Sequence, residues 1–136
     1  MIALHHVQVS CPPGGEDRAR TFYAEALGLT EVEKPADLRS RGGAWFRAYD
    51  AQGAVTVELH VGVEDPFTPA RKAHPAFVLG DGDELDAVAR ALLDAGFDVD
   101  RSEEHTFAGY RRLHTHDPFG KRVEVLTRDA PARDQE

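Results

Sequence analysis

Histidine and glutamate side chains recur at alternating positions along strand-like segments of this sequence. In residues 54–63, aliphatic residues alternate with polar ones, so Glu58 and His60 share one face of the predicted strand. The polar faces of the predicted strands together collect His6, Gln8, Ser10, Thr56, Glu58, His60, His74 and Glu124. Imidazole and carboxylate groups bind divalent ions and transfer protons, and so many of them do not suit a second hydrophobic core. We therefore interpret this face as a solvated, functional cup.

The elements that carry these residues are expected to form two similar modules. The first module begins with a strand over residues 4–10, followed by a helix over residues 19–27 that ends at Gly28. Its other strands are expected near residues 30–34, 43–50 and 54–63, with a turn at Gln52-Gly53 between the last two. The first half is therefore predicted to be β-α-β-β-β.

The second half repeats this order. A strand at residues 75–79 precedes a helix over residues 85–93 that ends at Gly96. Further strands are expected near residues 98–103, 108–116 and 121–127. The spacing is the same in both halves, because His6 precedes Gly28 and His74 precedes Gly96 by 22 residues each. We predict one domain over residues 1–128, made of module one (1–63), a crossover (64–73) and module two (74–128), with a frayed tail at 129–136.

The composition excludes several classes of partner. A formal net charge of −8 and a pI near 5.3 would repel nucleic acid, and the arginines form no basic stripe. No apolar run approaches the roughly 20 residues that cross a bilayer, so no membrane association is expected. The single cysteine, Cys11, cannot form an intrachain disulfide, and the first residues lack the features of an export signal. We therefore expect a cytoplasmic protein.

Four short motifs lie at corresponding places in the two modules or close the second one. They are Leu4-His5-His6-Val7, Phe22-Tyr23 to Leu27-Gly28-Leu29, Ala73-His74-Pro75-Ala76-Phe77, and Asp117-Pro118-Phe119-Gly120 through Glu124. With these motifs and its duplicated modules, the chain resembles the vicinal oxygen chelate superfamily of glyoxalases, bleomycin resistance proteins and extradiol dioxygenases. The resemblance covers nearly the whole chain. It implies an α+β fold in which two βαβββ modules form a cupped mixed sheet.

The resemblance also implies a metal site. Superfamily ligands come from the first and fourth strands of each module, where this chain has His6, Glu58, His74 and Glu124. His60 competes with Glu58, which we prefer because Val57-Glu58-Leu59 mirrors Val123-Glu124-Val125. This donor set suits a divalent ion such as Ni, Zn, Co, Mn or Fe, with coordination positions left open for substrate.

Several other residues are candidates for catalysis or for binding a substrate. Tyr110, Arg112 and His114 share one face of a predicted strand, and in similar proteins that face approaches the cup. Arg112 is able to hold a carboxylate or phosphonate, and His114 to transfer a proton near neutral pH, although an exposed polar strand face would have the same pattern. We therefore name Glu124 and His114 as catalytic candidates. The substrate-binding candidates are Gln8, Ser10, Trp45, Tyr110 and Arg112.

The resemblance leaves three functions open. A glyoxalase-like lyase or isomerase matches the ligand set, but Ser10 and Gly62 stand where the family has an arginine and an asparagine that serve glutathione. A fosfomycin-resistance-like transferase needs only His6, His74 and Glu124, yet its phosphonate contacts are not recovered around residues 97–114. A bleomycin-resistance-like protein would bind a drug or metabolite without metal or turnover. We favour the metal-dependent enzyme, acting on a small-molecule substrate.

We also expect a homodimer. One module offers only half of a cup, and strands one and five would otherwise remain at exposed sheet edges. In the expected dimer, His6 of one chain lies opposite His74 and Glu124 of its partner.

Overall fold

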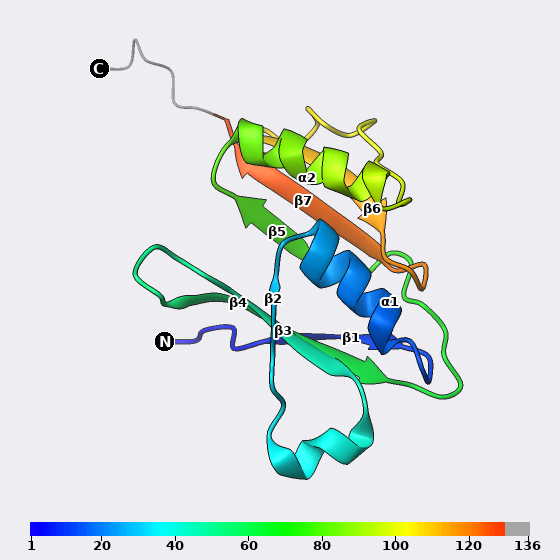
Figure 1. Cartoon of the computed structure of the whole chain (residues 1–136). Helices are drawn as coiled ribbons and strands as arrows, with labels where there is room; N and C mark the ends of the chain where they lie inside the picture. The colour runs from blue at the N-terminus through cyan, green and yellow to red at the C-terminus, as the bar shows by residue number, and fades with distance from the viewer. Residues whose placement is uncertain (130–136) are drawn as a thin grey trace. The chain divides into compact units, whose positions relative to one another are not determined.

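Figure 1 shows the computed structural model of the chain, which describes residues 1–129. The chain has two compact units, one formed by residues 1–69 with 118–120 and the other by residues 70–117 with the residues from 121 on. Each unit combines a mixed β-sheet with a helix, which confirms the predicted α+β class. Residues 130–136 of the predicted tail lie outside the described residues. The division into two modules of one domain stays a prediction.

The first unit contains a four-stranded sheet in the order β1-β4-β3-β2. Its strands are β1 (Val7–Cys11), β2 (Thr30–Val32), β3 (Ala44–Tyr49) and β4 (Val55–Val63). β1 is parallel to β4, and the other neighbours are antiparallel. All four strands overlap the segments predicted from sequence. β1 begins at Val7, so His5 and His6 precede the strand.

The helix of the first unit has two parts. The α-helix α1 (Glu16–Arg20) continues into the π-helical segment η1 (Thr21–Ala26). Phe22 and Tyr23 of η1 are fully buried, and the Tyr23 ring lies 5.9 Å from the ring of Phe46 on β3. Gly28 ends the helix with a φ of 89°, as the predicted stop requires. A 3₁₀ helix, η2 (Ala36–Arg41), connects β2 to β3.

The second unit contains a three-stranded sheet in the order β5-β7-β6, with one helix on its face (Figure 1). Its elements are β5 (Ala76–Leu79), α2 (Gly82–Asp94), β6 (Tyr110–His116) and β7 (Arg122–Arg128). Asp81 begins α2 by accepting a hydrogen bond from Glu84 N, and Leu85 and Leu92 pack into the core. The helix ends at Gly96, where Phe97 N donates to Leu92 O over 2.9 Å.

One expected strand is wrong. The segment 98–103 makes only an isolated bridge, between Asp100 and His114. The Asp100 carboxylate accepts a hydrogen bond from Ser102 N, which turns the chain away from the sheet directly after the bridge. Glu104, which follows in the turns, forms ion pairs with Arg101 and Arg111. The side chains of this segment therefore stabilise a turn instead of an edge strand.

The strand registers bring the polar residues of the first unit to one face. Gln8 and Trp45 both lie opposite His60 in the register, and Arg47 lies opposite Glu58. Leu59 and Val61, on the other face of β4, are buried as the alternation predicts. In residues 1–129, no helix is long and apolar enough to cross a membrane. The expected cytoplasmic location stays a prediction.

Candidate functional site

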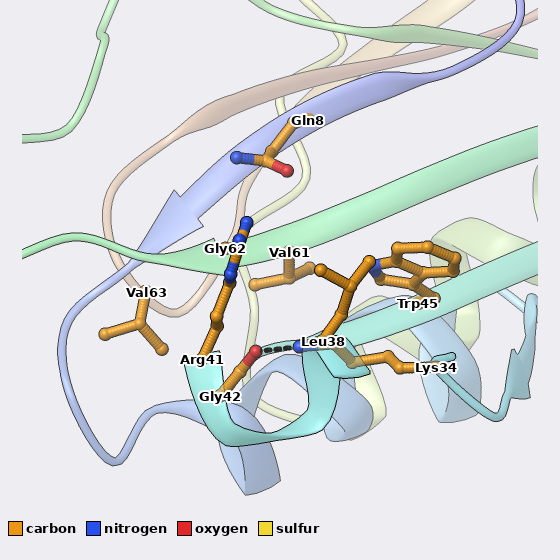
Figure 2. Close-up of a pocket in the computed structure, with 9 residues that line it drawn as sticks. All are labelled: Gln8, Lys34, Leu38, Arg41, Gly42, Trp45, Val61, Gly62 and Val63. Carbon is orange, nitrogen blue, oxygen red and sulfur yellow. Dashed lines mark hydrogen bonds between the residues drawn. The ribbon is translucent and has the colours of Figure 1, made fainter. Parts of the chain in front are cut away.

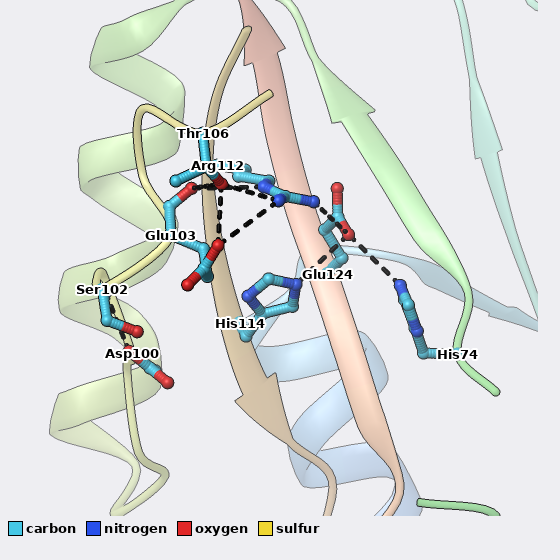
Figure 3. Close-up of polar contacts among 8 residues, drawn as sticks. All are labelled: His74, Asp100, Ser102, Glu103, Thr106, Arg112, His114 and Glu124. Carbon is cyan, nitrogen blue, oxygen red and sulfur yellow. Dashed lines mark hydrogen bonds and ion pairs between the residues drawn. The ribbon is translucent and has the colours of Figure 1, made fainter. Parts of the chain in front are cut away.

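One oxygen of Glu124 is the centre of a polar cluster in the second unit. Glu124 Oε1 lies 3.2 Å from His74 Nε2, 3.2 Å from His114 Nε2 and 3.3 Å from Arg112 Nη1 (Figure 3). The antiparallel register of β6 and β7 places His114 directly opposite Glu124. Glu124 and His114 are almost fully buried, whereas His74 is exposed. The cluster therefore opens to solvent on the His74 side.

The backbone around β5 holds His74 beside the carboxylate. Glu124 N donates to Pro75 O over 3.0 Å, and Lys121 Nζ donates to Ala73 O over 3.1 Å. These two bonds fix the residues on both sides of His74 against β7. The sequence order Ala73-His74-Pro75 therefore matters, because it sets the imidazole at the start of β5 and next to Glu124.

The tautomer of His74 follows from its second contact. His74 Nδ1 lies 2.8 Å from Lys72 O, and a carbonyl oxygen only accepts hydrogen bonds, so Nδ1 carries a proton. In the neutral ring, Nε2 then presents a lone pair to the Glu124 carboxylate. Two acceptor atoms at 3.2 Å need a cation between them, which is either a proton on Nε2 or a metal ion.

The donor atoms fit a divalent ion. The ligand atoms of His74, His114 and Glu124 all lie within 4.8 Å of one another. Two ligands of one ion with bonds of ~2.1 Å lie roughly 3–3.5 Å apart, which matches the two distances to Glu124. Two imidazoles and one carboxylate are a donor set that Zn, Ni, Co, Mn and Fe accept. The cluster thus offers ligands of the right type, with each histidine at a suitable distance from Glu124.

His114 differs from His74 in its environment. Burial lowers the pKa of the His114 imidazole, and Arg122 acts in the same direction, so the ring is neutral near pH 7. Its Nδ1 is buried and has no hydrogen-bond partner among the described residues. The tautomer that leaves no buried donor unsatisfied has its proton on Nε2, which then donates to Glu124, so Nε2 would have to lose this proton before it could bind a metal ion. His114 thus orients the carboxylate that it was expected to assist in catalysis.

Arg112 is held by its own unit. Its Nη1 contacts Glu124, its Nη2 donates to Thr106 Oγ1 over 2.8 Å, and its Nε donates to Glu103 O over 3.2 Å (Figure 3). The guanidinium also lies over the Phe107 ring. These contacts occupy every nitrogen that was expected to bind substrate. Tyr110, on the same strand, contacts Phe107 and Arg128 instead of the cluster.

In the first unit, the expected ligands contact one another. The rings of Trp45 and His60 are stacked at 3.8 Å, and His6 is stacked on His60 at 4.3 Å. Glu58 bonds to His60 through Oε2 at 2.9 Å and to Arg47 through Oε1 at 2.6 Å. Among the described residues of this unit, His6, Glu58 and His60 make no group of three with ligand atoms as close as those around Glu124.

Burial and neighbouring charges together determine the pKa values of Glu58 and His60. Burial alone would raise the pKa of Glu58, but hydrogen bonds from His60 and Arg47 outweigh it and hold that pKa below its usual value. Burial lowers the pKa of His60, and Glu58 offsets only part of that effect. Glu58 is therefore a carboxylate already neutralised by Arg47. Its role as a metal ligand, like those of His6 and His60, stays a prediction.

The substrate-binding candidates of the first unit divide into two groups. Gln8 and Trp45 line a pocket of about 180 Å³, whereas Ser10 does not. Sequence reasoning missed Arg47, Lys34 and Arg41, of which the last two line the same pocket. The register of β3 against β4 determines the position of Arg47. To predict that register from the sequence, the alternation in β3 and β4 must be combined with the position of the Gln52-Gly53 turn between them.

Comparisons with known proteins agree with this architecture. Residues 4–125 match the family model of the Glyoxalase/Bleomycin resistance protein/Dioxygenase superfamily. No curated protein sequence matches the chain.

Solved structures provide three points of reference. A protein described as belonging to the glyoxalase family, from Bacillus anthracis, is 36% identical, with a TM-score of 0.80 and coverage of 95% of this chain and 97% of that one. A glyoxalase/dioxygenase from Nostoc punctiforme is 22% identical, with a TM-score of 0.70 and coverage of 94% and 92%. The fosfomycin resistance protein FosX from Listeria monocytogenes is 12% identical, with a TM-score of 0.67 and coverage of 99% and 98%. The last two show a common fold alone.

The family match spans both units and includes the histidine and the glutamate that meet in the second one. The chain belongs to the Glyoxalase/Bleomycin resistance protein/Dioxygenase superfamily, which is the vicinal oxygen chelate superfamily that its motifs resemble.

Proposed function

We propose that this chain is a divalent-metal-dependent enzyme of the glyoxalase type, a lyase or isomerase that acts on a small molecule. The observation that carries the proposal is the contact between His74 and Glu124. His74 Nδ1 donates to Lys72 O, and Nε2 lies 3.2 Å from a carboxylate oxygen, so either a proton or a metal ion must lie between Nε2 and that oxygen. A divalent ion would resolve that contact, and Ni, Zn, Co, Mn and Fe all suit the donors.

The residues around the pair have supporting roles. A divalent ion bound here would act as a Lewis acid that polarises a substrate oxygen. His114 contacts Glu124 Oε1 and so orients its carboxylate, whereas Arg112 places a positive charge beside the same oxygen. His74 is the exposed member, so the open side of the cluster is where a small molecule would enter. His6 as a further ligand remains a prediction from the sequence.

A second function has one observation in its favour. Arg112 places a positive charge beside Glu124, and His114 forms a hydrogen bond to the same carboxylate oxygen. The carboxylate therefore already has protein partners. A protein that only binds a drug or metabolite, as bleomycin resistance proteins do, would need no more than this. The two functions differ in whether the cluster takes up a divalent ion.

The experiment is metal analysis with matched variants. Purified protein is stripped with a chelator, titrated separately with Ni²⁺, Zn²⁺, Co²⁺ and Mn²⁺ by calorimetry, and then assayed for bound metal by elemental analysis. We expect one ion per chain and a loss of about 100-fold in affinity for His74→Ala. The control is His116→Ala, a change in an exposed histidine of the same unit that pairs with Asp98. No uptake of any of these ions by the wild-type protein would favour the binding protein.

We also propose that the protein is a homodimer. Its support is that β1 and β5 each lie at an edge of their sheet, and an edge strand can pair with a strand of another chain. Val78 on β5 is exposed. Analytical ultracentrifugation should give twice the chain mass at micromolar concentration. A monomeric mass would contradict this assembly.

A further inference from the structure

The first unit contains a pocket of about 180 Å³ whose lining includes none of the predicted metal ligands. It lies between the strands and the connection that carries η2. Figure 2 shows Gln8 and Gly62 on one side, Trp45 and Leu38 on another, and Arg41 extending from the connection toward Gln8. All of these residues belong to one unit. The pocket is thus formed by this unit's own residues.

The pocket carries positive charge without a matching carboxylate in its lining. Arg41 makes no hydrogen bond or ion pair with any residue in the described part of the chain, although Arg39, two residues earlier, pairs with Glu33. Lys34 also lines the pocket and donates to Gly42 O. The nearby carboxylate of Glu16 is engaged by Gly43 N at 2.8 Å and does not line the pocket. In a protein with a net charge of −8, a lone guanidinium in a pocket indicates an anionic ligand.

The backbone that presents Arg41 is fixed before any ligand arrives. Gly42 and Gly43 both have positive φ, at 74° and 87°. A side chain at Gly43 would collide with the Val61 carbonyl, so this turn packs directly on β4. Gly42 N donates to Arg39 O, and the Lys34 ammonium holds Gly42 O. The backbone that carries Arg41 is therefore preorganised, so anion binding would mainly order the exposed Arg41 side chain.

The remaining walls suit a flat, partly apolar molecule. Trp45 and Leu38 supply apolar surface. The Gln8 amide lies over Gly62, where an added Cβ would come within 2.8 Å of Gln8 Nε2. Gly62 therefore leaves room for that amide, which offers both a donor and an acceptor beside the guanidinium.

From this geometry we propose that the pocket binds the carboxylate of a small planar molecule. Arg41 would hold the carboxylate, Gln8 would bond to its second oxygen, and Trp45 would contact the flat part. The inference deepens the proposed function, and rests on it only for the claim that the bound molecule is the substrate. Binding itself needs no metal, because none of the predicted metal ligands lines the pocket.

Trp45 makes this binding measurable, since it is the single tryptophan of the chain. Benzoate serves as the probe and its neutral isostere benzamide as the comparison, each titrated into the full-length, chelator-treated protein. Binding is followed by calorimetry and by the tryptophan fluorescence. We expect benzoate to bind and to change the Trp45 emission, with benzamide weaker by about tenfold or more.

Two variants place the anion. Arg41→Gln should weaken benzoate binding by about tenfold or more. Arg39→Gln is the matched control, because Arg39 lies two residues away, pairs with Glu33 and does not line the pocket, and it should bind as the wild type does. Thermal unfolding checks that both variants are folded. Inorganic phosphate, titrated in parallel, should bind more weakly than benzoate because it has no flat apolar part.

Three results would overturn the proposal. They are equal binding of benzoate and benzamide, equal binding by the wild type and Arg41→Gln, and phosphate binding as tight as that of benzoate. Metal uptake is measured separately, so a protein that binds benzoate but no divalent ion would contradict only the proposed enzyme. A protein that binds metal but not benzoate would contradict only this pocket.

Discussion

Three nitrogen atoms, of His74, His114 and Arg112, contact a single oxygen of Glu124, and the Arg112 guanidinium is the one that competes with a metal ion. This group lies 3.3 Å from Glu124 Oε1 and adds a positive charge where a divalent ion would sit. At the same time, the guanidinium donates a hydrogen bond to this buried carboxylate. If repulsion between Arg112 and the ion is the weaker effect, the cluster can bind a metal ion. If it is the stronger effect, the cluster is only a structural network of hydrogen bonds.

Arg112→Gln tests this balance. Removal of the charge should raise the affinity for a divalent ion by about tenfold, corresponding to ~1.4 kcal/mol of relieved repulsion. The measurement is calorimetric titration with Zn²⁺ or Ni²⁺. Arg111→Gln is the control, because the Arg111 side chain pairs with Glu104 and Asp86 instead. A loss of affinity in Arg112→Gln comparable to that of His74→Ala would contradict a competing role.

The Glu16 carboxylate accepts a hydrogen bond from Gly43 N, in the connection that carries Arg41. A hydrogen bond from Gly43 N lowers the pKa of Glu16 from its ordinary value of 4.5. Because the folded pKa is the lower one, the carboxylate stabilises the fold fully above the unfolded pKa, and this contribution is lost as the pH falls through the folded pKa.

Glu16→Gln should therefore lower the free energy of unfolding at pH 7, by about 1 kcal/mol for one charged hydrogen bond. The difference between wild type and variant should shrink as the pH is reduced from about 6 toward about 3. Urea unfolding at several pH values provides the measurement. A difference that stays constant over this range would show that the charge of Glu16 has no part in stability.

At the scale of elements, the turn between η2 and β3 depends on close approach of the backbone to β4. Gly43 has both a positive φ and no room for a Cβ, whereas Gly53 has a positive φ but nothing within 4 Å of the place that a Cβ would occupy. An alanine substitution at Gly53 would therefore test backbone strain alone, and one at Gly43 would test strain together with steric collision.

Gly53→Ala should cost about 1 kcal/mol, from backbone strain alone. Gly43→Ala should cost more, by an additional ~1–3 kcal/mol, because the Val61 carbonyl must move. Chemical denaturation of both variants measures the difference. Equal losses in the free energy of unfolding would mean that the turn relaxes freely. The backbone that carries Arg41 would then not be rigid.

The elements that the sequence predicted correctly are those with a strong local signal. Both helices end at glycines with positive φ, Gly28 and Gly96, and the alternation in residues 54–63 predicted β4. The strand at 98–103 failed because the Asp100 side chain bonds to Ser102 N, a local contact that competes with sheet pairing. Patterns of hydrophobicity do not register such a contact.

The candidate site could be predicted only in part, because cross-strand registers are not local. His74 and Glu124 were found from motifs, and they do meet. His114 was placed on the correct face, but its position opposite Glu124 depends on how β6 pairs with β7. Arg41 carries no motif at all. It lines a pocket because Gly42 and Gly43 turn the backbone against β4.

At the scale of the whole molecule, the superfamily fold supports many reactions, so membership does not identify the chemistry. Two features of this chain, one on each unit, bear on its chemistry. The second unit has donors for a divalent ion around Glu124, and the first has a cation in a pocket.

The central claim is that Glu124 binds a divalent ion together with His74, and Co²⁺ absorption spectroscopy tests it most directly. The wild-type protein, stripped of metal and titrated with Co²⁺, should develop a visible d–d band that saturates at one ion per chain. Glu124→Gln keeps the shape of the side chain but removes its charge, and should reduce the Co²⁺ affinity by about 100-fold. His116→Gln, the exposed control on β6, should titrate as the wild type does. A Glu124→Gln protein that develops the same band at the same Co²⁺ concentration as the wild type would contradict the account.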